Sequence, residues 1–167
     1  MCQIGEKVVH VNGGVFIVEE EKIMNYGFGN TKYLILKPYY INESNKTLTI
    51  YVPYDKKDEL IRKVMSKEEA LKLIEQIKVI EPIWYQDAKT RKDKFGELIR
   101  SKDINEICKV VKSLYVKQLE LQEKNKFLNL MDYDYLNKLK NGIEEELAIS
   151  LNMTVNEINE YITRYIK

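Results

Sequence analysis

Residues 5–18 read GEKVVHVNGGVFIV and contain two short apolar runs on either side of a tight-turn sequence. Valine, isoleucine and phenylalanine are common in strands, and Asn12-Gly13-Gly14 supplies residues that a turn between two strands requires. The stretch therefore predicts a β-hairpin at the start of the chain. His10, the single histidine of the sequence, falls in the first run and is expected to have a structural role.

Further strands are predicted up to residue 53. Residues 26–30 (YGFGN) form the next turn signal. The runs 33–36 (YLIL) and 48–52 (LTIYV) each end close to a proline, which cannot donate to a sheet ladder. Short strands joined by tight turns in this way predict a small β-barrel of the Tudor or SH3 type.

From Ser66 onward the apolar residues recur with the period of a helix. Residues 66–69 (SKEE) have the Ser-x-x-Glu form of a capping box, which predicts a helix start. After Pro82 a second helix is expected from near Trp84 to Ile99. The expected later helices begin at Asp103, at about Asn129 (through Leu151), and after a second capping box at residues 154–157.

The chain is therefore expected to be α+β with two domains. Residues 1–64 are expected to form a small Tudor/SH3-like β-barrel, and residues 65–167 an all-α helical bundle. With 44% apolar and 32% charged residues, the composition is typical of globular proteins. No apolar run reaches the roughly 20 residues of a membrane span, and the first residues lack the apolar stretch of a signal peptide. We therefore expect a cytoplasmic protein with no membrane partner.

The sequence lacks the motifs of common enzyme and metal sites. One histidine and two distant cysteines, Cys2 and Cys108, match no metal-ligand spacing, and no G-x-S-x-G turn is present. Cys108 is expected to be a buried apolar residue, and Glu144, Glu145 and Glu146 are expected to solvate a helix face. We predict a binding protein that is not an enzyme and has no cofactor, no metal and no small-molecule substrate. An enzyme that uses carboxylates alone is the least favoured alternative.

The single tryptophan, Trp84, opens a basic segment, residues 82–95 (PIWYQDAKTRKDKF). Over residues 89–117 the chain has 9 Lys and Arg against 4 Asp and Glu, which suits local contact with phosphates. Two interpretations are open. Trp84 packs as an anchor on the helical bundle, which composition alone favours. Alternatively it stacks on or wedges beside a base while Lys89, Arg91 and Lys92 bind phosphates, which the scarcity of apolar neighbours favours.

The order and spacing of several segments resemble the CarD/CdnL family of bacterial transcription regulators over about residues 4–152. The segments are GEKVVHVNGGVFIV, KYLILKP, LTIYVP, the tryptophan after a proline, SKDINEICKVVKSLY and EEELAISLNM. The resemblance implies a Tudor-like domain that docks on the β subunit of RNA polymerase. It also implies a helical domain in which Trp84 wedges into the minor groove of promoter DNA, largely independently of sequence, and stabilises the open complex at the upstream edge of the bubble.

The resemblance also implies site residues, with some departures. Lys32 and Tyr51 are the candidate polymerase contacts, and Tyr51 occupies a position where some members have an arginine. Family members often have Trp-x-x-Arg, whereas Asp87 stands at that place here. Many place a basic pair at the start of the third helix, where this chain has Tyr133 and Asp134.

The favoured function is therefore regulation of transcription initiation at the nucleoid, through RNA polymerase and promoter DNA. A sigma factor is a further candidate partner. The alternative is a protein-interaction adaptor, because related polymerase-docking barrels occur in the transcription-repair coupling factor. In that alternative the barrel docks on polymerase and the helical domain binds another protein.

Overall fold

The computed structural model describes residues 2–27 and 29–166, and the chain divides into two compact units. We call residues 1–65 the sheet unit and residues 66–167 the helical unit. The division falls one residue beyond the predicted domain boundary. Phe28, in the second predicted turn, and the two terminal residues lie outside the described residues.

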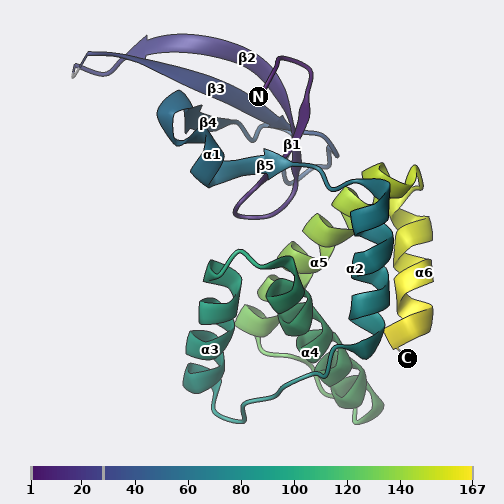
Figure 1. Ribbon diagram of the computed structural model, residues 1–167. Helices are drawn as coiled ribbons and strands as arrows, with labels where there is room; N and C mark the ends of the chain where they lie inside the picture. Colours follow the sequence, from purple (N-terminus) through teal and green to yellow (C-terminus); the bar gives the residue numbers. More distant parts are fainter. Residues whose placement is uncertain (1, 28, 167) are drawn as a thin grey trace. The chain divides into compact units, whose positions relative to one another are not determined.

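The sheet unit contains an antiparallel sheet with the order β4-β3-β2-β1-β5 (Figure 1). Its strands are β1 (Lys7–His10), β2 (Val15–Asn25), β3 (Asn30–Pro38), β4 (Ile50–Pro53) and β5 (Ile61–Lys63). Two short helical turns precede β5: the 3-10 turn η1 (Tyr54–Lys56) and α1 (Lys57–Leu60). The sequence did not predict β5. In this order β4 and β5 are the sheet edges, so closure into a barrel, which needs them to pair, stays a prediction.

The turn between β1 and β2 is the one predicted from Asn12-Gly13-Gly14. Gly13 and Gly14 have φ values of 87° and 91°, a conformation that side chains with a Cβ rarely adopt. His10 is buried beside this turn, where its Nδ1 accepts a hydrogen bond from the Asn12 N–H at 3.2 Å. Its ring meets that of Phe16 edge-on at 6.1 Å, so His10 has a structural role.

Alternate residues of the strands build one apolar core. It consists of Val8, Phe16, Val18, Leu34, Leu36, Val52 and Ile61. Since side chains alternate between the two faces of a strand, this set fixes which face of each strand points inward. The β2–β3 hairpin runs beyond this core, because Glu20, Glu21 and Lys22 are exposed on β2 and still pair with β3 after a register shift between Val18 and Glu20.

The helical unit contains five helices in its described residues. They are α2 (Lys67–Val79), α3 (Ala88–Arg100), α4 (Ile104–Glu123), α5 (Leu130–Leu151) and α6 (Val155–Ile166). Both predicted capping boxes form: Ser66 with Glu69, and Thr154 with Glu157. Asp103 caps α4 as predicted, and Asn129 caps α5.

Two predictions for this unit are wrong. The second helix begins at Ala88, not near Trp84, because the Asp87 carboxylate caps it by accepting a hydrogen bond from the Thr90 N–H at 2.7 Å. The Glu144–Glu146 run does not form a solvated face, since Glu144 and Glu146 are 4% and 1% exposed. The reason is that α5 contacts α2, α4 and α6, which cover more than one of its faces.

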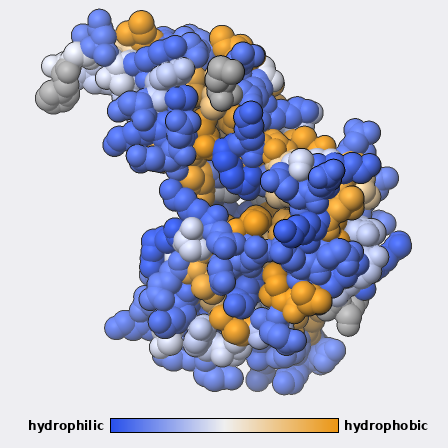
Figure 2. Space-filling model, viewed as in Figure 1, coloured by the Kyte–Doolittle hydropathy of each residue, from blue (hydrophilic) through white to orange (hydrophobic). Residues whose placement is uncertain are grey.

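Hydrophilic side chains cover most of the visible surface of each unit, with separate apolar patches among them (Figure 2). Within the described residues, no helix combines the length and the apolar character that crossing a membrane requires.

Replacement of Ser66 by alanine tests the first capping box. Ser66→Ala removes the acceptor of the Glu69 N–H, so we expect the free energy of unfolding of the helical unit to fall by about 1 kcal/mol. Urea unfolding followed by the fluorescence of Trp84, the single tryptophan, measures this change. Ser44→Ala, in an exposed loop of the sheet unit, is the control. Equal effects of the two variants would contradict a specific role of the cap.

Candidate nucleic-acid interface

Trp84 lies in the segment that joins α2 to α3, residues 80–87, which is neither helix nor strand. The Ile83 N–H donates a hydrogen bond of 2.9 Å to Ser113 Oγ, which ties this segment to α4. In Figure 1 the segment runs along one end of the helical unit, from the end of α2 to the start of α3. The Asp87 cap then fixes where the chain turns into α3.

The Trp84 side chain is half-buried and packs on the core of the helical unit. That core consists of Phe95, Val110, Leu114, Leu136 and Leu139. The rings of Trp84 and Tyr85 each meet the Phe95 ring edge-on, at 6.5 Å and 6.0 Å between centroids. The apolar neighbours that the local sequence lacks are thus supplied by α3, α4 and α5, which agrees with the anchor interpretation, whereas contact with DNA stays a prediction. Trp84 is an anchor, and part of its side chain still reaches solvent.

Arg91 holds this tryptophan from inside the unit. Its guanidinium is buried, and its Nε and Nη2 donate hydrogen bonds to Asp132 Oδ2 at 3.0 Å and 2.6 Å. Nη1 donates to the Tyr85 carbonyl at 2.7 Å, and Cζ lies 4.3 Å from the centroid of the Trp84 ring. The sequence grouped Arg91 with Lys89 and Lys92 as phosphate contacts. In the structure Arg91 is buried and bonded inside the unit, whereas the two lysines are exposed.

Asp132, in the first turn of α5, is a site residue that the sequence did not reveal. Its Oδ2 accepts a further hydrogen bond from Asn129 Nδ2 at 2.8 Å, beside those from Arg91. The sequence placed the start of α5 at about Asn129, which caps this helix in the structure. No local pattern links Asp132 to an arginine 41 residues away, so only the tertiary structure shows the pair.

A second cation, Lys117 on α4, lies near the same ring. Its Nζ is 5.3 Å from the Trp84 ring centroid and 2.8 Å from Glu120 Oε2. The hydrogen bond from Lys117 holds the pKa of the Glu120 carboxyl below its usual value. Two cations thus lie near the Trp84 ring, and cations are attracted to the electron-rich face of an indole.

Lys89 and Lys92 are exposed on the first turns of α3, and neither ammonium forms an ion pair within the described residues. Positive charge at a helix start opposes the helix dipole and costs about 0.3–1 kcal/mol. The hydrogen bonds of the cap also lower the pKa of the Asp87 carboxyl, chiefly through the Thr90 N–H, so this carboxylate stays charged nearby. These two lysines therefore do not stabilise α3 and remain available to an anionic partner.

The structure does not bring the two candidate polymerase contacts together. Lys32 shares a face of β3 with Leu34, where its Nζ binds Glu21 at 2.6 Å and lies 4.3 Å from the Tyr54 ring centroid. The hydrogen bond to Glu21 raises the pKa of Lys32. Tyr51 is 48% exposed and lies opposite Ile35, on the other face of the sheet from the core residue Val52. One flat contact cannot include both side chains.

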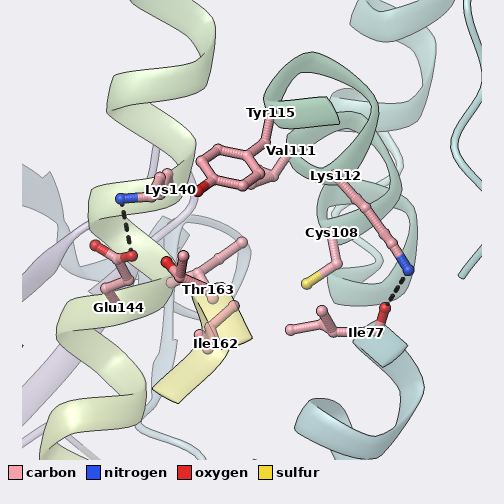
Figure 3. Close-up of a pocket in the computed structure, with 10 residues that line it drawn as sticks. Ile77, Cys108, Val111, Lys112, Tyr115, Lys140, Glu144, Ile162 and Thr163 are labelled. Carbon is pink, nitrogen blue, oxygen red and sulfur yellow. Dashed lines mark hydrogen bonds and ion pairs between the residues drawn. The ribbon is translucent and has the colours of Figure 1, made fainter. Parts of the chain in front are cut away.

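A small cavity of about 30 Å³ lies among α2, α4, α5 and α6 (Figure 3). Its lining is mainly apolar, and its charged residues are already bonded: Lys112 Nζ donates to the carbonyl oxygens of Ile77 and Lys78, and Lys140 pairs with Glu144 at 3.0 Å. Burial raises the pKa of the Cys108 thiol to about 12, so it is neutral at pH 7. The cavity has room for about one or two waters, and Trp84 is the stronger candidate for function.

Residues 2–65 match the family model of the CarD-like/TRCF RID domain. The match confirms the predicted resemblance over the sheet unit and fits an RNA polymerase-interacting, transcription-related protein. Residues 66–167, which include Trp84, lie outside the matched range. Comparison with curated proteins gives no match for the chain.

Loss of Asp132 tests the anchor of Trp84. Asp132→Ala leaves the Arg91 guanidinium buried without its carboxylate, so we expect the free energy of unfolding of the helical unit to fall by about 3–5 kcal/mol. Urea unfolding measures the loss, and acrylamide quenching of Trp84 fluorescence reports whether the ring becomes more exposed in the folded state. Asp134→Ala removes an exposed acid two residues further along α5 and is expected to change stability by less than about 0.5 kcal/mol. A similar loss in both variants would argue against the buried pair as the anchor.

Proposed function

We propose that this protein regulates transcription initiation by docking on the β subunit of RNA polymerase and stabilising the open promoter complex. The matched RID domain is the docking part, and we propose that its sheet closes as a Tudor-like barrel. The observation that carries the DNA part is a half-buried tryptophan whose ring lies against the Arg91 guanidinium, close in the chain to Lys89 and Lys92, which form no ion pair among the described residues. The proposed action involves no enzymatic chemistry.

The geometry of Trp84 supports a wedge more than a stacking platform. Arg91 lies 4.3 Å from the ring centroid and Phe95 meets the ring edge-on, so contacts inside the unit already occupy part of the indole. A ring held in this way presents a fixed edge, which suits insertion beside a base step. Wedging into intact duplex costs a few kcal/mol per step, so DNA that is already opening is the favoured partner. We propose the minor groove at the upstream edge of the bubble as its place.

Phosphate contact in this proposal rests on Lys89 and Lys92. Arg91 is left out of it, because its donors bind Asp132 and the Tyr85 carbonyl. Two phosphate contacts give a shallow salt dependence, with a slope of about −2 in a plot of log K against log salt concentration. Such contacts carry no sequence preference, which fits action at many promoters.

For polymerase docking we propose Tyr51 as the contact, since its side chain is exposed on the outer face of β4. Lys32, which is held by Glu21 and Tyr54 on the other face, is the weaker candidate. The exposed part of the long β2–β3 hairpin offers a second contact, for which a sigma factor is a candidate partner.

Replacement of Trp84 tests the wedge. We expect Trp84→Ala to shorten the lifetime of open complexes several-fold, because the unstacked step loses its support; filter binding with a heparin challenge measures this lifetime. The variant also loses packing on Phe95, so its stability is measured in parallel and the assay is run where it is fully folded. Tyr85→Ala loses a similar contact with Phe95 and is the matched control. Equal losses in the two variants would mean that Trp84 acts only as an anchor.

Pull-down of core RNA polymerase, and of its isolated β lobe, by the full-length chain tests the docking. We expect Tyr51→Ala to reduce capture severalfold. Tyr133→Ala, in the helical unit, is a control of equal exposure, at 47% against 48% for Tyr51. Capture that is unchanged by Tyr51→Ala would remove this residue from the contact. The adaptor function would be supported if the chain captures polymerase but no variant changes the lifetime of open complexes.

A further inference from the structure

The loop between α4 and α5 presents a phenylalanine to solvent at the same end of the helical unit as Trp84. Phe127 is 86% exposed. The next residue, Leu128, packs on the same core cluster as Trp84, and Asp132 in the first turn of α5 binds Arg91. Figure 1 shows the α4–α5 loop and the segment before α3 at this one end of the unit. The loop that contains Phe127 and the segment that contains Trp84 therefore lie at one end of the unit, and their neighbouring residues pack on the same core.

The backbone of this loop is fixed at both ends, so the exposure of Phe127 is built into the fold. Asn125 adopts a left-handed conformation with φ of 53°. The Lys126 N–H donates to the Leu121 carbonyl at 2.8 Å, which closes the end of α4 in the manner of a Schellman motif. Asn129 then caps α5 through the Asp132 N–H. A large apolar side chain exposed to water by a loop that is hydrogen-bonded at both ends is suited to a partner.

The charge around Phe127 favours an anionic partner. Lys124 and Lys126 flank it in the loop, and residues 124–131 contain no acid. Lys124 acts on Glu120, whose pKa it helps to lower, whereas Lys126 forms no ion pair in the part of the chain that the structure describes. An apolar protein groove would gain little from these lysines. A nucleic-acid strand offers both a base to stack on and phosphates to neutralise.

Phe127 differs from Trp84 in what already touches its ring. Arg91 and Lys117 lie over the indole, and Phe95 meets its edge. By contrast, no other ring and no cation lies against Phe127 among the residues that the structure describes. A ring without such neighbours can accept a base on its face, which the held indole is less suited to do.

We infer that Phe127 and Lys126 form a second nucleic-acid contact, in which the Phe127 ring stacks on an unpaired base and the Lys126 ammonium binds a neighbouring phosphate. The inference rests on the proposed function, because the unpaired base belongs to the strand that opens beside Trp84. The tryptophan then supports the edge of the opening, and the phenylalanine holds one exposed base next to it.

The test uses the full-length chain and two fluorescein-labelled DNA probes, one fully paired and one with an internal bubble of unpaired bases. Fluorescence anisotropy gives the affinity for each probe at several salt concentrations. We expect Phe127→Ala to weaken binding to the bubble probe about tenfold and to leave binding to the paired probe nearly unchanged. Phe127→Tyr keeps an aromatic face and is expected to restore the affinity. Lys126→Ala is expected to weaken both probes and to reduce the salt slope by about 1.

Leu71→Ala and Lys72→Ala are the matched controls, because both residues are exposed neighbours on α2. Phe127 is exposed, so circular dichroism is expected to show an unchanged fold in its variants.

The inference is overturned if Phe127→Ala binds the bubble probe as tightly as the unaltered chain, or if Leu71→Ala loses as much affinity as Phe127→Ala. It is also overturned if Phe127→Ala changes only self-association or polymerase capture, which would make the loop a protein contact. If Trp84→Ala loses binding to the bubble probe and Phe127→Ala does not, this inference is rejected and the proposed function stands. If the unaltered chain does not bind the bubble probe, both are contradicted.

Discussion

The buried ion pair between Arg91 and Asp132 joins three parts of the helical unit: α3, the first turn of α5 and the segment that carries Trp84. A guanidinium can leave water only when its donors are bonded, and here Asp132 and the Tyr85 carbonyl bond them. Its planar face then lies over the indole. Lysine has neither the planar fork nor the flat face, so it could not make these contacts at once. Arg91 thus contacts the tryptophan ring together with Phe95 and Lys117.

The same pair divides the basic segment into two classes of cation. Arg91 is used inside the unit, whereas Lys89 and Lys92 point to solvent from a helix start, where the dipole disfavours them. A partly exposed aromatic ring close in the chain to two exposed lysines suits a partner with phosphates and accessible bases. The Asp87 carboxylate among them has a separate task, because it caps α3. This capping role explains an acid at position 87.

Features that depend on neighbouring residues could be predicted from the sequence. The Gly13-Gly14 turn, the Ser66 and Thr154 capping boxes and the Asp103 cap arise within a few residues, and each is present in the structure. Some predictions failed where distant segments compete with the local pattern, whereas the start of α3 was misplaced although its Asp87 cap is local. Glu144 and Glu146 look like a solvated run, yet the packing of α5 against several helices buries them. β5 was missed because three residues carry too weak a pattern.

The sequence by itself determined the order of a β-rich part and a helical part, the division between them near residue 65, the capped starts of α2, α4 and α6, and the similarity of the first part to RID domains. It also singled out Trp84. Only the tertiary structure decided that Arg91 is buried, that Asp132 is its partner 41 residues away, and that Lys32 and Tyr51 lie on opposite faces of the sheet. The physical reason is range: caps and turns are made by residues a few positions apart, whereas burial and ion pairing depend on which distant surfaces the fold brings into contact.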